Sequence, residues 1–413
     1  MIDSSSSLAV PPVVSPIPEV TFALNLGRAL QEFGVSAQTL ENALGRLAHH
    51  LGLEGAVYAT PTGFLASFQK LRGPSTTYLI RTGSYSANLA KLAETEALVD
   101  RVIDDSMGVD EALWQLEQIS RRSPRFGPLI QIGAYAIAAM GMAVVFGGGW
   151  REALLSSLIG ALVGLAAQFL EQKRNQISLA PLVGGIISSL GGIVLGNLVP
   201  SISHPILILS GFIVLVPGLG LLVSMQELGT GNLVAGTSRL VGTGFVLMLL
   251  AFGVAIGQRL GSGWYGGLIA EPKALPFWAI PPAIALVALG YLVVFQGALR
   301  DYTWTLGASI VAYGSARMTT QLMGPEVGSG IAALVLGAVC NHYSRRTRRP
   351  GAVLLLPSLM LIVPGSKGFQ GLLMVLHKHT LEGLQAGFQA LTVTVALMLG
   401  LLLANVLVPR RRF

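Results

Sequence analysis

The tripeptide Val-Pro-Gly occurs twice in this sequence, as Val216-Pro217-Gly218 and as Val363-Pro364-Gly365, each near the middle of a long apolar segment. Proline removes a backbone hydrogen-bond donor and glycine accepts conformations that helices forbid, so a helix is expected to break at both places. A segment of about 20 apolar residues is long enough to cross a bilayer. The repeat therefore predicts a membrane protein built from two related halves, each with one interrupted span.

Composition supports a membrane protein. Of the 413 residues, 52% are hydrophobic and only 11% are charged, whereas about a quarter of the residues in a soluble protein are charged. Residues 1–128 hold 10 Lys/Arg and 13 Asp/Glu, and residues 129–413 hold 17 and 7. The arginines of the second region lie in short loops between apolar runs and form no basic stripe, so we expect no nucleic-acid partner.

Several other classes of site are disfavoured by the residues present. Cys340 is the one cysteine of the sequence, which excludes an intrachain disulfide and a multi-cysteine metal site. We expect no metal and no cofactor. Residues 1–19 are rich in serine and proline and lack the basic start and apolar core of a signal peptide, so they are predicted to be a disordered, uncleaved tail.

Residues 20–128 are predicted to form a small cytoplasmic α+β domain. Ser36 is suited to cap a helix that ends near Leu51, and Gly52 suits the left-handed position that follows it. Three β-like runs and two further helices follow, at 56–60, 64–68, 76–82, 88–105 and 109–120. The titratable residues of this domain match no known catalytic motif, so we predict that the protein is not an enzyme.

The remainder of the chain is predicted to be an α-helical polytopic membrane protein with ten transmembrane helices. The first five-helix repeat occupies 129–257, a linker occupies 258–276, and the second repeat occupies 277–413. The eighth segment, 327–342, is short, so the alternative that it enters the membrane without fully crossing it stays open. The ten apolar segments are 129–147, 153–170, 177–200, 205–225, 233–257, 277–297, 303–322, 327–342, 352–376 and 383–408.

The positions of the basic residues predict the orientation of the spans. If both termini are cytoplasmic, most arginines between spans lie on the cytoplasmic side, as the positive-inside rule requires. The loop at 345–349 holds four arginines, whereas its counterpart at 201–204 holds none. Arg151-Glu152 also aligns with Arg300-Asp301 at an offset near 150 residues. Because each half has an odd number of spans, the second half must be inverted relative to the first, as in many secondary transporters.

The interrupted helices are the candidate binding site. Half-helix amino termini carry partial positive charge and free carbonyls carry partial negative charge, an arrangement that suits a zwitterion. The alternative is a proline kink without a ligand. The candidate substrate-binding residues are the break residues and the nearby charged residues, namely Pro217, Gly218, Glu227, Arg239, Pro364, Gly365 and Lys367.

Charged residues near membrane depth have more than one interpretation. Arg239 could bind a substrate carboxylate, pair with Glu227, or extend to the cytoplasmic surface. Glu227 and Glu326 are the candidates for proton coupling, if they are not simply loop carboxylates.

Several motifs resemble the threonine/serine exporter family. They are Val109-Asp110-Glu111-Ala112-Leu113 at the end of the soluble domain, and Leu215-Val216-Pro217-Gly218 leading to Glu227-Leu228 and Arg239. The resemblance implies proton-coupled export of threonine or serine from the cytoplasm across the inner or plasma membrane. A membrane-anchored enzyme that uses the soluble domain, and a channel that uses the breaks, are the alternatives. Homo-oligomerisation stays open.

Overall fold

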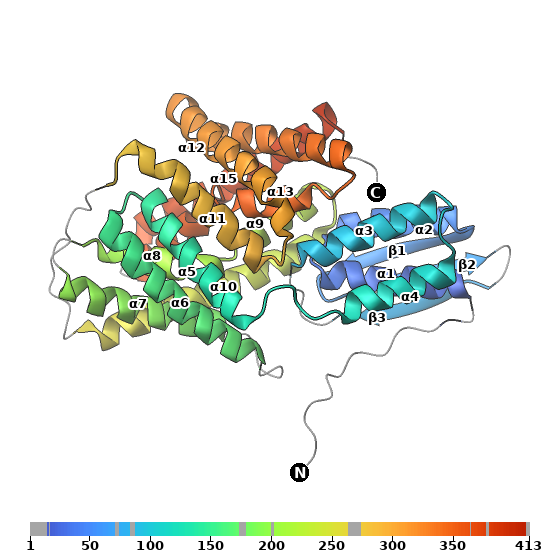
Figure 1. Cartoon of the computed structure of the whole chain (residues 1–413), viewed down its shortest axis with the longest axis horizontal. Coiled ribbons are helices and arrows are strands. Elements are labelled where there is room, and N and C mark those ends of the chain that lie inside the picture. The colour runs from blue at the N-terminus through green and yellow to red at the C-terminus, as the bar shows by residue number, and fades with distance from the viewer. Residues whose placement is uncertain are drawn as a thin grey trace, which may run out of the picture. The chain divides into compact units, whose positions relative to one another are not determined.

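The computed structural model describes residues 15, 17–70, 74–82, 87–172, 179–199, 202–262, 274–363, 365–376 and 380–409. It divides into two compact units (Figure 1). One comprises the chain up to Ala87 together with Lys91–Ser123, and the other comprises Asn88–Ala90 and Pro124–Arg412.

The N-terminal unit contains a three-stranded antiparallel sheet in the order β1-β2-β3. The strands are β1 (Leu53–Thr60), β2 (Gly63–Lys70) and β3 (Thr76–Arg81), which confirms the three predicted β runs. Ala59, Phe64 and Ile80 are paired across the strands and buried on one face. Alternation along the strands thus gives the sheet one apolar core face.

The helices of this unit are α1 (Pro18–Glu32), α2 (Ala37–His50), α3 (Leu89–Ile103) and α4 (Val109–Arg121). As predicted, the Ser36 side chain accepts a hydrogen bond from the Thr39 amide, and Gly52 has φ 68°. Helix α1 was not predicted. The prolines before it indicated a tail, yet Pro18 stands at the first helical position, where its missing N–H costs nothing. Residues 1–14 and 16 of the predicted tail lie outside the described residues.

The second unit is helical. Its first part contains α5 (Pro128–Val145), α6 (Trp150–Gln172), α7 (Ala180–Leu198), α8 (His204–Gly211), the 3₁₀ turn η1 (Ile213–Leu215), α9 (Gly218–Gly229) and α10 (Leu233–Leu260). Its second part contains η3 (Phe277–Ala279), α11 (Ile280–Val294), η4 (Leu299–Asp301), α12 (Tyr302–Thr347), α13 (Ala352–Leu359), α14 (Gly365–Leu376) and α15 (Thr380–Leu407).

Among the described residues, seven helices are long and apolar enough to cross a membrane. The count is eight if the bent pair formed by α8 and α9 is one span. Many large apolar side chains on these helices face outward, including Leu158, Phe169, Phe252 and Leu403. The protein is therefore a helical polytopic membrane protein with a small sheet and helices in its N-terminal region.

Helix α12 is not one straight rod. Gly324 has non-helical angles (φ 83°, ψ 166°), and the Thr319 hydroxyl donates to the Gly328 carbonyl at 2.8 Å. A Cβ atom at Gly328 would lie 2.4 Å from the Thr320 amide nitrogen. Residues eight apart in a helix lie about 12 Å apart, so the chain must fold back here. The second leg, from Pro325 to Thr347, is about 34 Å long and exceeds the short segment predicted at 327–342.

The same order of helix lengths occurs twice in this unit. Helices α8 and α13 each have 8 residues, α9 and α14 each have 12, and α10 and α15 each have 28. The contacts are also reciprocal: α9 packs on α15, α14 packs on α10, and α5 packs on α11. The repeated order brings the two interrupted helices to one place.

Candidate functional site

The first interruption lies between α8 and α9. Helix α8 ends at Gly211, the turn η1 follows, and Val216 (φ −67°, ψ 120°) and Pro217 (φ −81°, ψ 52°) leave helical geometry before α9 starts at Gly218. The two helices are bent by 51°. The predicted break at the first Val-Pro-Gly is therefore confirmed.

The second interruption lies between α13 and α14. Helix α13 ends at Leu359, the Val363 amide donates to the Leu359 carbonyl at 2.9 Å, and α14 begins at Gly365. Pro364 and the side chain of Lys367 lie outside the described residues. The second helix also ends and restarts around its Val-Pro-Gly tripeptide, while the function of Lys367 stays a prediction.

The two interruptions touch each other reciprocally. A Cβ atom at Gly218 would lie 2.7 Å from Cγ1 of Val363, and a Cβ atom at Gly365 would lie 2.7 Å from Cγ1 of Val216. Real Cβ atoms essentially never come this close to another heavy atom, so the contact requires glycine at both positions. The structure thus brings together Gly218 and Gly365, which lie 147 positions apart in the sequence.

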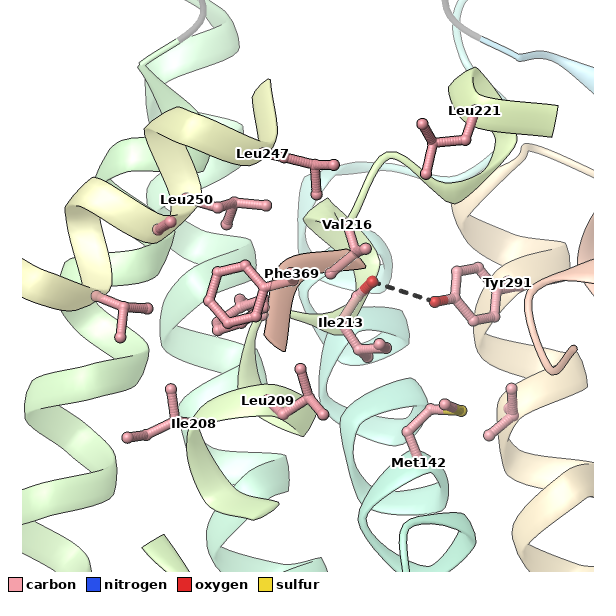
Figure 2. Close-up of a cluster of buried hydrophobic side chains, with 14 residues drawn as sticks. Met142, Ile208, Leu209, Ile213, Val216, Leu221, Leu247, Leu250, Tyr291 and Phe369 are labelled. Carbon is pink, nitrogen blue, oxygen red and sulfur yellow. Dashed lines mark hydrogen bonds between the residues drawn. The ribbon is translucent and has the colours of Figure 1, made fainter. Parts of the chain in front are cut away.

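Val216, one residue of this contact, belongs to a cluster of buried apolar side chains (Figure 2). The Phe212 and Phe369 rings, one from each half, meet edge to face with centroids 4.7 Å apart. Val216, Leu221 and Leu247 belong to the same buried cluster. The two breaks are therefore closed against each other, and a ligand between them requires the helices to separate.

One polar group reaches the first break from the second half of the chain. The hydroxyl of Tyr291, on α11, donates to the carbonyl of Ile213 at 3.3 Å (Figure 2). The sequence interpretation did not select this tyrosine. An aromatic residue in an apolar span gives no sign of which backbone carbonyl it will meet.

Glu227 on α9 and Arg239 on α10 form a buried ion pair. Arg239 donates from Nε to Oε2 at 2.9 Å and from Nη2 to Oε1 at 3.0 Å. The Glu227 side chain has 0% of its surface exposed and that of Arg239 has 13%. Of the three predicted interpretations of Arg239, the structure therefore has the pairing with Glu227. Such a bidentate pair is strong and directional.

This ion pair is not at the breaks. Glu227 follows Gly218 by nine residues of one helix, which places it about 14 Å farther along the axis. A Cβ atom at Gly220 would lie 2.4 Å from Oγ1 of Thr243, so Arg239, one turn earlier on α10, also lies beyond the break. One amino acid cannot contact the breaks and the ion pair at once.

Glu326 lies elsewhere in the helical unit. It opens the second leg of α12, is half-buried, and has its Oε2 atom 3.7 Å from the position of a Cβ at Gly324. Among the described residues, no hydrogen bond or ion pair joins it to either break. Its place in proton coupling stays a prediction.

Two buried serine pairs were missed by the sequence interpretation. The Ser210 hydroxyl donates to Ser156 at 2.7 Å, and the Ser309 and Ser358 hydroxyls are 3.0 Å apart. All four are fully buried. Ser210 and Ser358 stand in the last turns of α8 and α13, just before each break. A serine at the same place in two apolar spans was the available signal.

Two buried acids hold the loops that lead into the interrupted helices. Glu152 accepts hydrogen bonds from the amides of Gly149 at 3.0 Å and Ser203 at 3.2 Å. Asp301 accepts from the Tyr343 hydroxyl at 3.2 Å and pairs with Arg349. The two acids occupy corresponding positions of the two halves, at an offset near 150 residues, but no function was predicted for them. Each one joins the start of a long helix to the loop before α8 or α13.

Two family models match this chain, one in each half. Residues 21–261 match a family described as "Putative threonine/serine exporter", and residues 282–407 match one described as "Threonine/Serine exporter, ThrE". The first match alone covers more than half of the chain. The chain belongs to the threonine/serine exporter family. The resemblance stated from its motifs is thus confirmed, and the boundary between the two models lies between the two helix series.

Curated relatives of this exporter family member occur in fungi. Pheromone-regulated membrane protein 10 of Saccharomyces cerevisiae is 25% identical over 86% of the chain and 47% of its own length. The protein of the same name from Pichia sorbitophila is 24% identical over 86% and 37%. An uncharacterized protein of Schizosaccharomyces pombe is 26% identical over 85% and 48%. The chain thus spans half or less of these relatives' length. No solved structure matches the chain.

Proposed function

We propose that this protein is a secondary active transporter that exports threonine or serine from the cytoplasm across the cell membrane and is driven by protons. Family membership supports the substrate class. The observation that carries the proposal is the reciprocal contact of Gly218 with Val363 and of Gly365 with Val216. It supports one shared site built from two interrupted helices, as broken transporter helices form at membrane depth.

The proposed architecture is ten spans in two inverted five-helix repeats with both termini cytoplasmic. The seven long helices and the bent pair give eight spans, the second leg of α12 gives a ninth, and α13 with α14 gives a tenth. A twofold axis would carry the α9–α15 contact onto the α14–α10 contact, and both are present. Five spans per repeat make the repeats antiparallel in the membrane.

The proposed substrate site uses the backbone at Pro217, Gly218, Pro364 and Gly365. Helices α9 and α14 both begin at the contact, so their free amides and dipoles would attract the substrate carboxylate. Once the breaks separate, carbonyls at the ends of η1 and α13 would accept from the substrate ammonium group. Lys367, in the first turn of α14, would add positive charge near the carboxylate.

The proposed proton-coupling element is the Glu227–Arg239 pair. When Glu227 is ionised, the pair ties α9 to α10. When Glu227 is protonated, the pair is lost and α9 is free to move away from α10, which opens the contact at the other end of α9. Glu326 is the second candidate for this function.

The experiment is counterflow of labelled threonine and serine in proteoliposomes that contain the full chain. The proposal predicts exchange of both amino acids in the wild type and a strong loss of exchange in Gly218→Leu. Arg239→Ala should retain substrate binding and lose the response to a pH gradient. Absence of exchange in correctly inserted wild-type protein, or current at channel rates without counterflow, contradicts the proposal.

A further inference from the structure

Pro217 leaves one identifiable carbonyl without its helical partner. In an uninterrupted helix, the N–H of residue 217 would bond the carbonyl of residue 213, and proline has no N–H. A carbonyl has two lone pairs, and at membrane depth no bulk water is present to use the second one. The Ile213 carbonyl keeps one backbone donor, the Val216 amide at 3.2 Å, and receives the Tyr291 hydroxyl at 3.3 Å as its second. Tyr291 thus replaces the donor that Pro217 removes.

The surroundings of Tyr291 make this hydroxyl distinctive. Tyr291 is 2% exposed, and its ring stacks on Phe295 with centroids 5.8 Å apart. Of the fourteen residues drawn in Figure 2, it alone bears a hydroxyl group. A buried tyrosine hydroxyl generally requires a partner, and here the partner is the Ile213 carbonyl.

The two halves differ at this position. The offset of 149 residues that aligns Phe146 with Phe295 places Met142 opposite Tyr291. Met142 lies in the same buried cluster, yet its thioether cannot donate a hydrogen bond. A donor from this position is therefore available to the first break and not to the second.

We propose that Tyr291 is a positioning residue of the transport site. Its hydroxyl holds the Ile213 carbonyl while the site is empty and closed, and it yields that carbonyl to the substrate ammonium group when the breaks separate. The hydroxyl and the ammonium group therefore compete for one acceptor. This function of Tyr291 rests on the proposed transport activity, whereas its effect on the first break does not.

Tyr291→Phe is the test variant, and Tyr302→Phe is its matched control. The Tyr302 hydroxyl donates to the Ala285 carbonyl at 3.0 Å, inside the regular helix α11, where that carbonyl also has the Leu289 amide as its helical partner. Hydrogen exchange of residues 213–221 is measured by mass spectrometry without substrate, and the KM for threonine is measured by counterflow.

We expect about tenfold faster exchange in Tyr291→Phe, because a buried carbonyl loses one of its two donors, together with a lower KM for threonine, because the competitor is gone. Tyr302→Phe should change neither. Equal exchange in wild type and Tyr291→Phe, or the same increase in Tyr302→Phe, would overturn the proposal. Faster exchange with an unchanged KM would overturn the competition with ammonium. If the wild type shows no counterflow, the transport proposal fails and the exchange data still decide whether Tyr291 holds the break.

Discussion

The two interrupted helices have equal helix lengths and the same Val-Pro-Gly tripeptide, and they differ in the charged side chains beyond the break. Both place a glycine against a valine of the other, and both carry a buried serine one turn or two before the break. The first has the Glu227–Arg239 pair beyond it, whereas the offset of 147 residues places Met374 and Ala386 at the corresponding positions of the second. Reciprocal glycine–valine contacts can form one binding site, and asymmetric charge can give the two halves different functions.

The symmetric part of the comparison should show the largest effects. Gly218→Leu and Gly365→Leu should each reduce threonine counterflow by at least ~100-fold, because a side chain at either position overlaps a valine of the other helix. Gly242→Leu is the control, since a Cβ atom there meets nothing within 4 Å. Near-normal transport in one of the two variants would show that the contact is not shared.

The asymmetric part should show the next largest effects. Glu227→Gln or Arg239→Gln alone should destabilise the protein by about 3–5 kcal/mol, because each substitution removes one charge and leaves the opposite charge of the pair buried without it. The double variant should lose less than the sum, and Met374→Leu in the other half should change little. Thermal unfolding in detergent measures these values. Additive losses in the double variant would mean that the pair is not coupled.

The serine pairs should show equal, smaller effects in the two halves. Ser210→Ala and Ser358→Ala each remove one partner of a buried hydroxyl pair and should cost about 1 kcal/mol. The double variant Ser156→Ala with Ser210→Ala should cost less than twice this amount, because no unpaired hydroxyl is left. Unequal losses of stability in Ser210→Ala and Ser358→Ala, measured by the same unfolding assay, would show that the two spans are not equivalent.

The smallest effect is expected in the N-terminal unit, where Glu19 accepts a hydrogen bond from Lys70. That bond lowers the pKa of Glu19 from its usual 4.5. Its stabilisation is therefore present above about pH 4.5 and is lost as the pH falls through the lowered pKa. Both side chains are partly exposed, so Glu19→Gln should cost less than about 1 kcal/mol at pH 7 and less still at pH 3. An equal cost at both pH values would exclude the charged pair as its cause.

The sequence predicted most of what local chemistry determines. Proline and glycine in an apolar span were enough to place both breaks, and Ser36 and Gly52 were enough to end a helix. Helix α1 was missed because Pro18 is compatible with both a tail and a helix start. The separation of the apolar segments 303–322 and 327–342, by contrast, is confirmed, because the fold-back at Gly324 lies between them.

The site was predicted less completely, because it depends on packing between distant segments. The partner of Arg239 stayed open until the register of α9 against α10 was known. The closing of Gly218 on Val363 and the bond from Tyr291 to Ile213 join residues 145 and 78 positions apart. The separation of the ion pair from the break, by contrast, follows from nine residues of helix and could have been inferred from spacing.

The most direct test of the shared site is a disulfide between the two breaks. Gly218→Cys and Val363→Cys are introduced together with Cys340→Ala. The Cβ position of Gly218 lies 3.5 Å from that of Val363, within the range of a disulfide, and Val363→Cys removes the Cγ1 atom that a side chain at residue 218 would overlap. Threonine counterflow is measured in the reduced state, after oxidation and after renewed reduction. We predict that oxidation links the two positions, that threonine slows the reaction, and that the link abolishes the exchange seen in the reduced state. Complete cross-linking with unchanged counterflow would contradict a substrate site that opens between the two breaks.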